Sequence, residues 1–358
     1  MKASSKVTLS DVAARAGVST TTASYILNGR SAQMRISPDT EQRVRRAVAE
    51  LGYRPNISAR NLRTATTETF GVISDFVASG QYASQMLTGA SAAARASGHL
   101  LVIGESEGDP DVERRLIEEM VDRRVDGIVY VRLVHSEVTV PAALSHARAV
   151  LLNCVDRASP LPAVLPDERQ GGRRAADVLL EAGVAERVYV VGQDPNPVAL
   201  AGPLRLAGVR ERLHEAGHDL GGVVPCDWTV EAAHDAVHLW LMSGVQPSAL
   251  VCLNDRVAMG TYQALATNNL DVPRDVAVVS FDGSELASWL RPPVTSVALP
   301  FAALGTRAVQ LLLEGQDAAG GVVSVPMDVV HGRSVTIVRP VRETASAGPP
   351  RRSEERPP

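Results

Sequence analysis

The side chains in this sequence best suited to binding chemistry follow the predicted strands. They are amide, carboxylate, guanidinium and aromatic groups, and as a set they suit a polyhydroxylated ligand. Hydroxyl groups exchange hydrogen bonds with the polar side chains, and an aromatic ring packs on the apolar C–H face. Each residue taken singly is better explained as a strand-end cap or a surface group, so the signal is their joint placement. The candidate ligand-binding residues are Asp75, Tyr82, Asn153, Arg205, Trp228, Asn254 and Asp282.

Apolar runs that alternate with helical stretches place these residues at strand ends. We expect strands at 70–74, 100–104, 127–131, 150–153, 188–192, 249–253 and 276–281. We expect helices between them, among others at 82–97, 112–123, 170–181 and 205–216. This alternation is typical of parallel sheets covered by helices, which bind ligands beyond the carboxyl ends of their strands. The body is too long for one six-stranded sheet, and 162–166 resembles a crossover, so we predict two α/β lobes with a cleft between them.

A second group of residues, near the amino terminus, has the pattern of a helix-turn-helix. Thr8 and Asp11 form a potential capping box before a helix at 9–16, and Gly17 ends that helix. Ser19 is a good cap for a second helix at 20–27, which Asn28 and Gly29 would end. A third helix is expected to start at Ser37-Pro38 and to run through residue 50.

In a helix-turn-helix, the first residues of the second helix face base edges in the major groove. Here these residues are Thr20 and Thr21, with Tyr25 one turn later, while Ser24 and Asn28 are better placed for phosphates. Helical hairpins are common, so the alternative is an ordinary pair of helices without a DNA-binding role.

The segment 53–63 combines arginines with an isolated leucine. Pro55 can start a helix that continues through Asn56 and Ala59, but two turns are too short to be stable alone. Leu62 beside Arg63 resembles the apolar wedges that minor-groove proteins insert between base steps. A plain linker with a stray leucine is the alternative.

Charge is distributed unevenly along the 358 residues, whose formal net charge is −4. Residues 1–64 contain eleven arginines and lysines against four acids, a balance of +7, which leaves −11 for the remainder. A basic head on an acidic body indicates that only the head meets a polyanion, although a solvated basic surface would have the same charge.

Composition and motifs exclude several other classes of protein. The chain is 45% hydrophobic, an ordinary globular value, and it has no apolar run long enough to span a membrane. The polar start lacks a signal peptide, so we expect a cytoplasmic protein. The three cysteines, at 154, 226 and 252, lack zinc or disulfide spacing and are expected to be small buried residues.

No motif predicts a catalytic centre, a metal site or a cofactor. The stretch His214 to His218 fits HExxH, but Gly217 would end the helix that a zinc site needs. The sequence contains no GxGxxG, Walker or GxSxG motif, so neither nucleotide binding nor a serine hydrolase is predicted. No leucine heptads occur in the tail at 343–358, which we expect to be disordered and not to form a tetramer-forming coiled coil.

The strings 7–19, 22–29 and 53–63 together resemble the lactose-repressor (LacI/GalR) family of bacterial transcription regulators, and the likeness extends to about Pro340. The resemblance implies a homodimer whose paired hinge helices fold in the minor groove, with Leu62 as the wedge. Two residues depart from the family pattern: Ala23 replaces a frequent valine and Tyr25 a frequent arginine. Because tyrosine cannot make arginine's bidentate pair with guanine, the usual base preference does not carry over.

In the body, the resemblance covers the strings 204–208, 227–228, 254–255 and 281–282, which it implies line an effector cleft, with the arginine at 205 gripping a sugar. Asp167 with Gly171 and Gly172 matches the start of the second lobe. Asn153, Gly283 and Leu299 differ from residues found in other members, so the resemblance does not imply which sugar is bound.

The predicted fold class is α plus α/β: a helix-turn-helix head with a hinge helix, then a two-lobed body like periplasmic binding proteins, with two parallel sheets flanked by helices. The expected domains are 1–64 and 69–340, with lobe 1 at about 69–164 plus 299–323 and lobe 2 at about 165–298 plus 324–340. We predict a homodimeric regulator, not an enzyme, that binds a near-palindromic operator and releases it when a sugar effector closes the cleft. Alternatives are a transport solute-binding protein, a purine-responsive corepressed regulator or an enzyme acting on a sugar or nucleotide.

Overall fold

The computed structural model describes residues 7–54, 66–78, 84–193, 196–315 and 321–336. By its internal contacts the chain divides into a small unit up to Thr67 and a large unit from Glu68 onward. The hinge residues Asn56, Ala59, Leu62 and Arg63, the ligand candidate Tyr82 and the tail lie outside the described residues.

The small unit contains three helices, α1 (Leu9–Ala16), α2 (Thr20–Leu27) and α3 (Pro38–Leu51). Thr8 and Asp11 form the predicted capping box, Gly17 ends α1 with φ of 68°, and Ser37 caps α3. Local cap and stop residues therefore set these ends, as the sequence predicted. A small core joins the helices through Val12, Ala13, Ala16, Ala23, Ile26, Val44 and Ala47.

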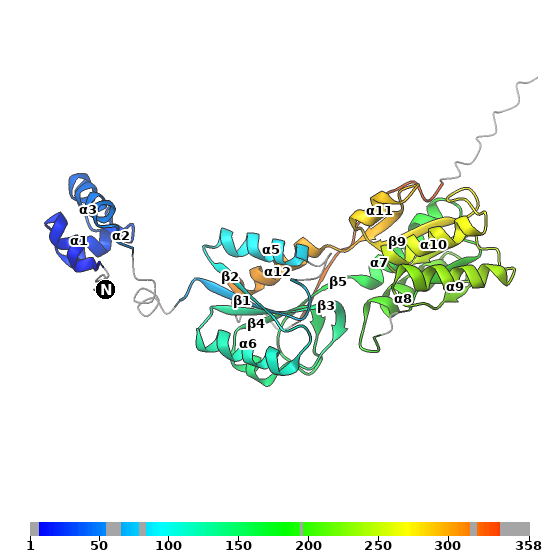
Figure 1. Ribbon diagram of the computed structural model, residues 1–358, viewed down its shortest axis with the longest axis horizontal. Coiled ribbons are helices and arrows are strands. Elements are labelled where there is room, and N and C mark those ends of the chain that lie inside the picture. Colours follow the sequence, from blue (N-terminus) through cyan, green and yellow to red (C-terminus); the bar gives the residue numbers. More distant parts are fainter. Residues whose placement is uncertain (1–6, 55–65, 79–83, 194–195, 316–320, 337–358) are drawn as a thin grey trace, which may run out of the picture. The chain divides into compact units, whose positions relative to one another are not determined.

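The first sheet of the large unit has six strands in the order β11-β5-β4-β3-β1-β2, all paired in parallel. Helices α5 and α12 cover one face and α6 the other (Figure 1). The elements are β1 (Thr69–Ser74), α5 (Ser84–Ala96), β2 (Leu100–Glu105), α6 (Pro110–Asp122), β3 (Gly127–Glu137), the 3₁₀ helix η1 (Ala142–His146), β4 (Ala149–Val155), β5 (Ala163–Pro166), α12 (Phe301–Glu314) and β11 (Val322–Val325).

The second sheet also has six strands, in the order β12-β10-β9-β8-β6-β7, and only its β10–β12 pair is antiparallel. Helices α7 and α8 share one apolar core with this sheet, while α9 to α11 share another. The elements are α7 (Glu168–Glu181), β6 (Val188–Val191), α8 (Ala201–Glu215), β7 (Gly222–Val224), α9 (Val230–Met242), β8 (Ala249–Cys252), α10 (Asp255–Thr267), β9 (Ala277–Asp282), α11 (Glu285–Trp289), β10 (Thr295–Ala298) and β12 (Val329–Val330).

One sequence interpretation was wrong. Residues 162–166 were read as a crossover, but Ala163–Pro166 is strand β5 of the first sheet. Its short run Ala-Val-Leu-Pro is entirely buried, so it lacks the alternation that marks a half-exposed strand. The chain passes to the second lobe directly after β5, where Asp167 caps α7.

Close helix contacts position the second lobe's polar residues. A Cβ on Gly172 would lie 2.1 Å from the Arg205 carbonyl oxygen, and one on Gly208 2.0 Å from the Arg169 carbonyl oxygen. Only glycine permits this approach of α7 to α8. The start of α7, at Arg169 and Gly172, therefore packs against α8 at Arg205 and Gly208.

Candidate DNA interface and effector site

The amino end of α2 is built to face a polar surface. The Ser19 hydroxyl accepts a hydrogen bond from the Thr22 amide at 3.0 Å, which fixes the helix start. Thr20 and Thr21, the next two residues, are exposed. Thr8, before α1, is also exposed, but its hydroxyl and amide both bond to Asp11. Thr8 and Ser19 thus have a demonstrated capping role, and their DNA contacts remain a prediction.

Tyr25 has a neighbour that sequence reasoning missed. The Arg30 guanidinium lies 5.6 Å from the centre of the Tyr25 ring, a cation–π distance, and its Nε donates to Gln33. The Asn28 amide donates to the Ser24 carbonyl at 2.7 Å, closing the carboxyl end of α2. The exposed face of α2 therefore presents hydroxyls at its start and a tyrosine–arginine pair at its end.

In the first lobe, two predicted ligand residues support an irregular part of β3. Between Val131 and Ser136 the pairing of β3 with β4 shifts register, so residues 132–135 bulge out. Asp75 accepts a hydrogen bond from the Leu133 amide at 2.9 Å, and the Asn153 amide donates to the carbonyls of Arg132 and Leu133 at 3.0 Å. Asn153 has φ of 57°, an uncommon value for a non-glycine residue. These contacts show the two side chains holding the bulge.

A buried polar cluster that the sequence did not reveal lies beside this bulge. The Arg132 guanidinium is 2.8 Å from a Glu113 carboxylate oxygen and also donates to the Tyr130 hydroxyl. The Tyr130 hydroxyl in turn donates to Glu113 at 3.1 Å. Burial raises the pKa of Tyr130, so the phenol stays protonated. The arginine at the start of this bulge is therefore already paired with a carboxylate.

In the second lobe, Arg205 is the centre of the predicted site and is only 1% exposed. Its Nε lies 2.6 Å from Glu168 at the start of α7, and it also donates to the Leu253 carbonyl. The guanidinium lies 3.6 Å from Asp282 and 5.5 Å from the centre of the Trp228 ring. Predicted residues from β9, α8 and the loop after β7 thus come together, and Glu168 joins them.

The carboxylates around Arg205 differ in their charge state. Burial alone would raise the pKa of Glu168, but the charge and hydrogen bonds of Arg205 hold it below its usual value. Burial raises the pKa of Asp282 to about 7 against the pull of Arg205, and the neighbouring charges of Asp255 and Glu168 add to the rise. Burial also raises the pKa of Asp255, which accepts hydrogen bonds from three serines. Asp282 therefore changes charge near neutral pH.

Backbone conformation holds two more predicted residues at strand ends. Asp282 has φ of 97°, which is costly for a non-glycine residue and is characteristic of constrained functional positions. Asn254, 1% exposed, caps α10 by accepting from the Val257 amide at 2.7 Å. Its demonstrated role is structural, and a ligand contact remains a prediction.

A histidine from the first lobe reaches this cluster. His135, at the end of the β3 bulge, is 4% exposed, and its Nδ1 lies 3.6 Å from Glu168. Its carbonyl accepts from the Leu200 amide, and Glu137 pairs with Val198. No sequence signal links residues this far apart, because the contact depends on the β3 bulge.

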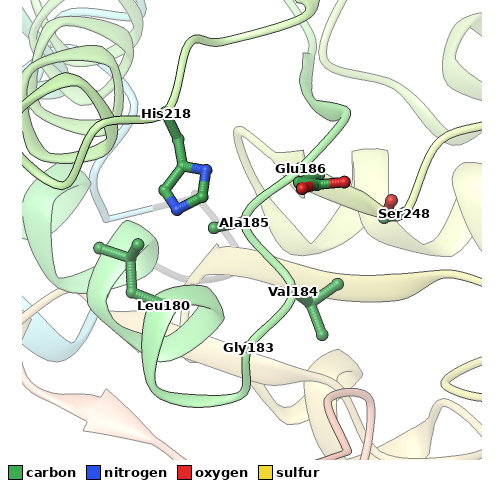
Figure 2. A pocket seen from close by; sticks show the side chains of 7 residues that line it. All are labelled: Leu180, Gly183, Val184, Ala185, Glu186, His218 and Ser248. Carbon is green, nitrogen blue, oxygen red and sulfur yellow. The ribbon is translucent and has the colours of Figure 1, made fainter.

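The remaining candidate sites are not supported as binding sites by the described structure. Figure 2 shows a cavity of about 260 Å³ lined by Leu180, Gly183, Val184, Ala185, Glu186, His218 and Ser248. It lies near the starts of β6 and β8, and no predicted ligand residue lines it.

Helix α8 ends at Glu215, so His214 and His218 do not share a helix. Among the described residues no group of three potential metal ligands occurs, and no described helix is long and apolar enough to cross a membrane.

The architecture is that of a DNA-binding, ligand-responsive transcription regulator: a capped helix-turn-helix followed by two parallel-sheet lobes with polar strand ends. The family model "Bacterial regulatory proteins, lacI family" matches residues 8–56, and the model "Periplasmic binding protein-like domain" matches residues 176–335. The HTH-type transcriptional regulator AscG of Escherichia coli is 32% identical over 82% of this chain and 87% of its own length. The chain therefore belongs to the LacI family, and it is a transcriptional regulator rather than an enzyme.

Further relatives agree with this placement. The ribose operon repressor of Escherichia coli is 30% identical over 86% of this chain and 92% of its own length. A crystal structure of the Lac repressor dimer bound to operator and the anti-inducer ONPF has a TM-score of 0.76 and 26% identity, covering 92% of this chain and 99% of that one. The regulator CelR in complex with cellobiose has a TM-score of 0.64 and 26% identity, with the same coverage. The predicted fold class and family are thus confirmed.

Proposed function

We propose that this chain is a cytoplasmic, sugar-responsive repressor that binds a near-palindromic operator as a homodimer. The observation that carries the proposal is the conjunction of an exposed, capped α2 with the buried Arg205 site in one chain of this family. Relatives named for ribose and cellobiose, and a Lac repressor dimer bound to operator, support the sugar and the operator. The predicted domains, 1–64 for DNA and 69–340 for effector and dimerisation, belong to this proposal.

For DNA, we assign base contacts to the exposed amino end of α2 and to Tyr25. The hinge candidates Asn56, Ala59, Leu62 and Arg63 would fold in the minor groove, with Leu62 as the wedge. Ser24, Asn28, Thr8 and Ser19 would lie near phosphates. Such contacts make operator binding strongly salt-dependent, because each neutralised phosphate releases counterions.

A pair of chains is proposed because a two-fold protein reads a two-fold site. The edge strand β2 offers a surface for pairing, since Leu100 is 71% exposed, Val102 46% and Ile103 43%. Exposed apolar patches of this kind mark association surfaces.

For the effector, Arg205, Trp228 and Asp282 form the second-lobe side of the proposed site. Asp75, Tyr82, Asn153 and Asn254 remain candidate contacts at the strand ends. A ligand that binds a closed form of the lobes better than an open one would shift the population toward the closed form. We propose that this form separates the hinge helices, which then lose their mutual support and release the operator.

The test is a thermal-shift panel of mono- and disaccharides and purines with the full chain, followed by operator-binding assays with any responder. A ligand at about 100 times its dissociation constant stabilises the fold by about 2.7 kcal/mol. A sugar responder that weakens operator binding supports the proposal. A purine responder that strengthens it supports the corepressed alternative, which the similarity to a PurR repressor of Vibrio campbellii, at 30% identity, keeps open.

The wedge has its own test. Leu62→Ala should reduce specific operator affinity and leave the effector affinity of the isolated body unchanged, because Leu62 is not among the proposed effector contacts. Unchanged operator affinity would exclude the wedge.

A further inference from the structure

The guanidinium of Arg205, the group best suited to hold an anion, is already neutralised within the fold. Two of its nitrogens lie 2.6 and 3.3 Å from the two carboxylate oxygens of Glu168. Both side chains are 1% exposed, so water scarcely screens the pair. We infer that Glu168 is a specificity-determining residue: it acts as a built-in counter-charge that restricts the effector site to uncharged ligands and excludes sugar phosphates and other anions. This inference rests on the proposed effector function.

The charge balance around Arg205 works against an anionic ligand. Besides Glu168, the Asp282 carboxylate lies 3.6 Å from the guanidinium, and the Leu253 carbonyl accepts one of its protons. Asp255 lies close enough to influence both Arg205 and Asp282. Arg205 therefore already has one buried carboxylate, Glu168, as its counter-charge, with two further acidic side chains nearby whose pKa values burial raises. A phosphate that approached would meet like charge, which is an effective means of rejecting a wrong ligand.

An anion that displaced Glu168 from Arg205 would also bind unfavourably. The carboxylate is buried, and its other neighbour is His135 from the first lobe, with Nδ1 at 3.6 Å. Removing one partner of a buried ion pair leaves an uncompensated charge in the interior and is strongly unfavourable. A phosphate that took Arg205 would thus leave Glu168 buried without its cation.

The first lobe offers no substitute in the described residues near the bulge. The guanidinium of Arg132, in β3 at the start of the bulge, lies 2.8 Å from Glu113 and is likewise paired. Arg132 in β3 and Arg205 in α8 therefore each have their own carboxylate partner.

Two buried side chains without hydrogen-bond partners point to a ligand that exchanges hydrogen bonds without bringing charge. Within the described part of the chain, the Trp228 indole nitrogen and the His135 ring nitrogens are buried and have no hydrogen-bond partner. Buried polar groups are almost always paired, so these atoms mark places for a ligand or water. A hydroxyl can both donate and accept, and it meets either need without bringing charge.

The experiment compares matched neutral and phosphorylated sugars on the full chain at constant ionic strength. The probes are D-ribose with ribose 5-phosphate, D-glucose with glucose 6-phosphate, D-fructose with fructose 1-phosphate, and cellobiose. The readouts are thermal shift and calorimetric titration. Binding of one or more neutral sugars, with at least tenfold weaker binding of the phosphates, supports the inference. Binding of phosphates in preference overturns it while leaving the effector function intact. No binding by any probe counts against the proposed sugar effector itself.

A variant tests the role of Glu168 directly. Glu168→Gln keeps the shape but frees Arg205, so inorganic phosphate and the sugar phosphates should now raise the melting temperature. The matched control is Glu215→Gln, which removes a surface partner of Arg173 at 2.6 Å between the same two helices and should leave phosphate without effect. Phosphate stabilisation of both variants, or of neither, would overturn the assignment. If Glu168→Gln does not fold, the comparison on the unmodified chain still decides the inference.

Discussion

At the residue scale, the proposed base-reading position differs from the arginine common in the family. Tyr25 carries one hydroxyl on a rigid ring, and Arg30 stacks on that ring at 5.6 Å. A phenol makes a single hydrogen bond where an arginine makes a bidentate pair with guanine. The operator should therefore differ from those of arginine-bearing relatives at one base pair in each half-site.

We predict that Tyr25→Arg changes the preferred base at one symmetric position and leaves the salt dependence of binding unchanged. Selection from random duplexes followed by titration at several salt concentrations measures both. Tyr25→Phe is the control for the hydroxyl alone. Identical selected sites for the tyrosine and arginine proteins would remove Tyr25 from the readout.

Asp282 makes stability depend on pH in a defined direction. Because burial raises its folded pKa to about 7, above its ordinary value of 3.8, the folded chain binds a proton more tightly than the unfolded chain. Its contribution to stability is thus complete below pH 3.8 and is lost as pH rises toward 7. We predict that Asp282→Asn, which keeps a neutral side chain, gains melting temperature relative to the parent as pH rises from 5 to 8, about one unit past the Asp282 pKa. A difference that does not vary with pH would contradict this.

At the element scale, caps and close contacts explain why the helices begin and meet where they do. Thr8, Ser19 and Ser37 cap α1, α2 and α3 through their own neighbours, so these starts could be read from the sequence. The pairing of α7 with α8 depends on Gly172 and Gly208 facing each other across two helices. No pattern of neighbouring residues other than these two glycines predicts this helix pair.

We predict that Gly208→Ala destabilises the body by about 1–3 kcal/mol, because the added methyl must push α8 away from α7. The same shift should weaken effector binding, since Glu168 and Arg205 lie at this contact. Denaturant unfolding and ligand titration measure the two effects. Arg210→Ala, on the exposed side of α8, is the control. A Gly208→Ala protein as stable as that control would disprove the close-contact argument.

At the scale of the whole molecule, the proposed dimer connects the edge of the first sheet to operator affinity. The apolar side chains of β2 lie on the last strand of the first sheet, whose outer edge no described strand pairs with. Unprotected edges of this kind associate with other chains unless they are covered. A second copy of the chain is the proposed cover.

We predict that Val102→Glu shifts the protein toward monomer and lowers operator affinity. In a dimer, binding of one head raises the effective concentration of the other head at its half-site, and a monomer loses this gain. Sedimentation across a range of concentrations and operator titration give the readouts. Leu239→Glu, at an apolar position on α9 that is more exposed than Val102, is the control and should remain dimeric. Dissociation by Leu239→Glu alone would move the interface to α9.

The sequence by itself determined the helix-turn-helix, the alternation of strands and helices, and the family, because caps, stop residues and apolar periodicity act over a few neighbouring residues. It also singled out Arg205 in a helix, Trp228 in a loop and Asp282 after a strand, and the structure brings these three together. Only the tertiary structure decided what those groups touch. Glu168 is 37 residues from Arg205, and His135 reaches it from the other lobe through a bulge that Asp75 and Asn153 hold open. Strand β5 was likewise recognisable only by its neighbours. Contacts of this kind depend on how whole sheets and helices pack, and no local pattern of residues encodes the charge that a buried side chain will meet.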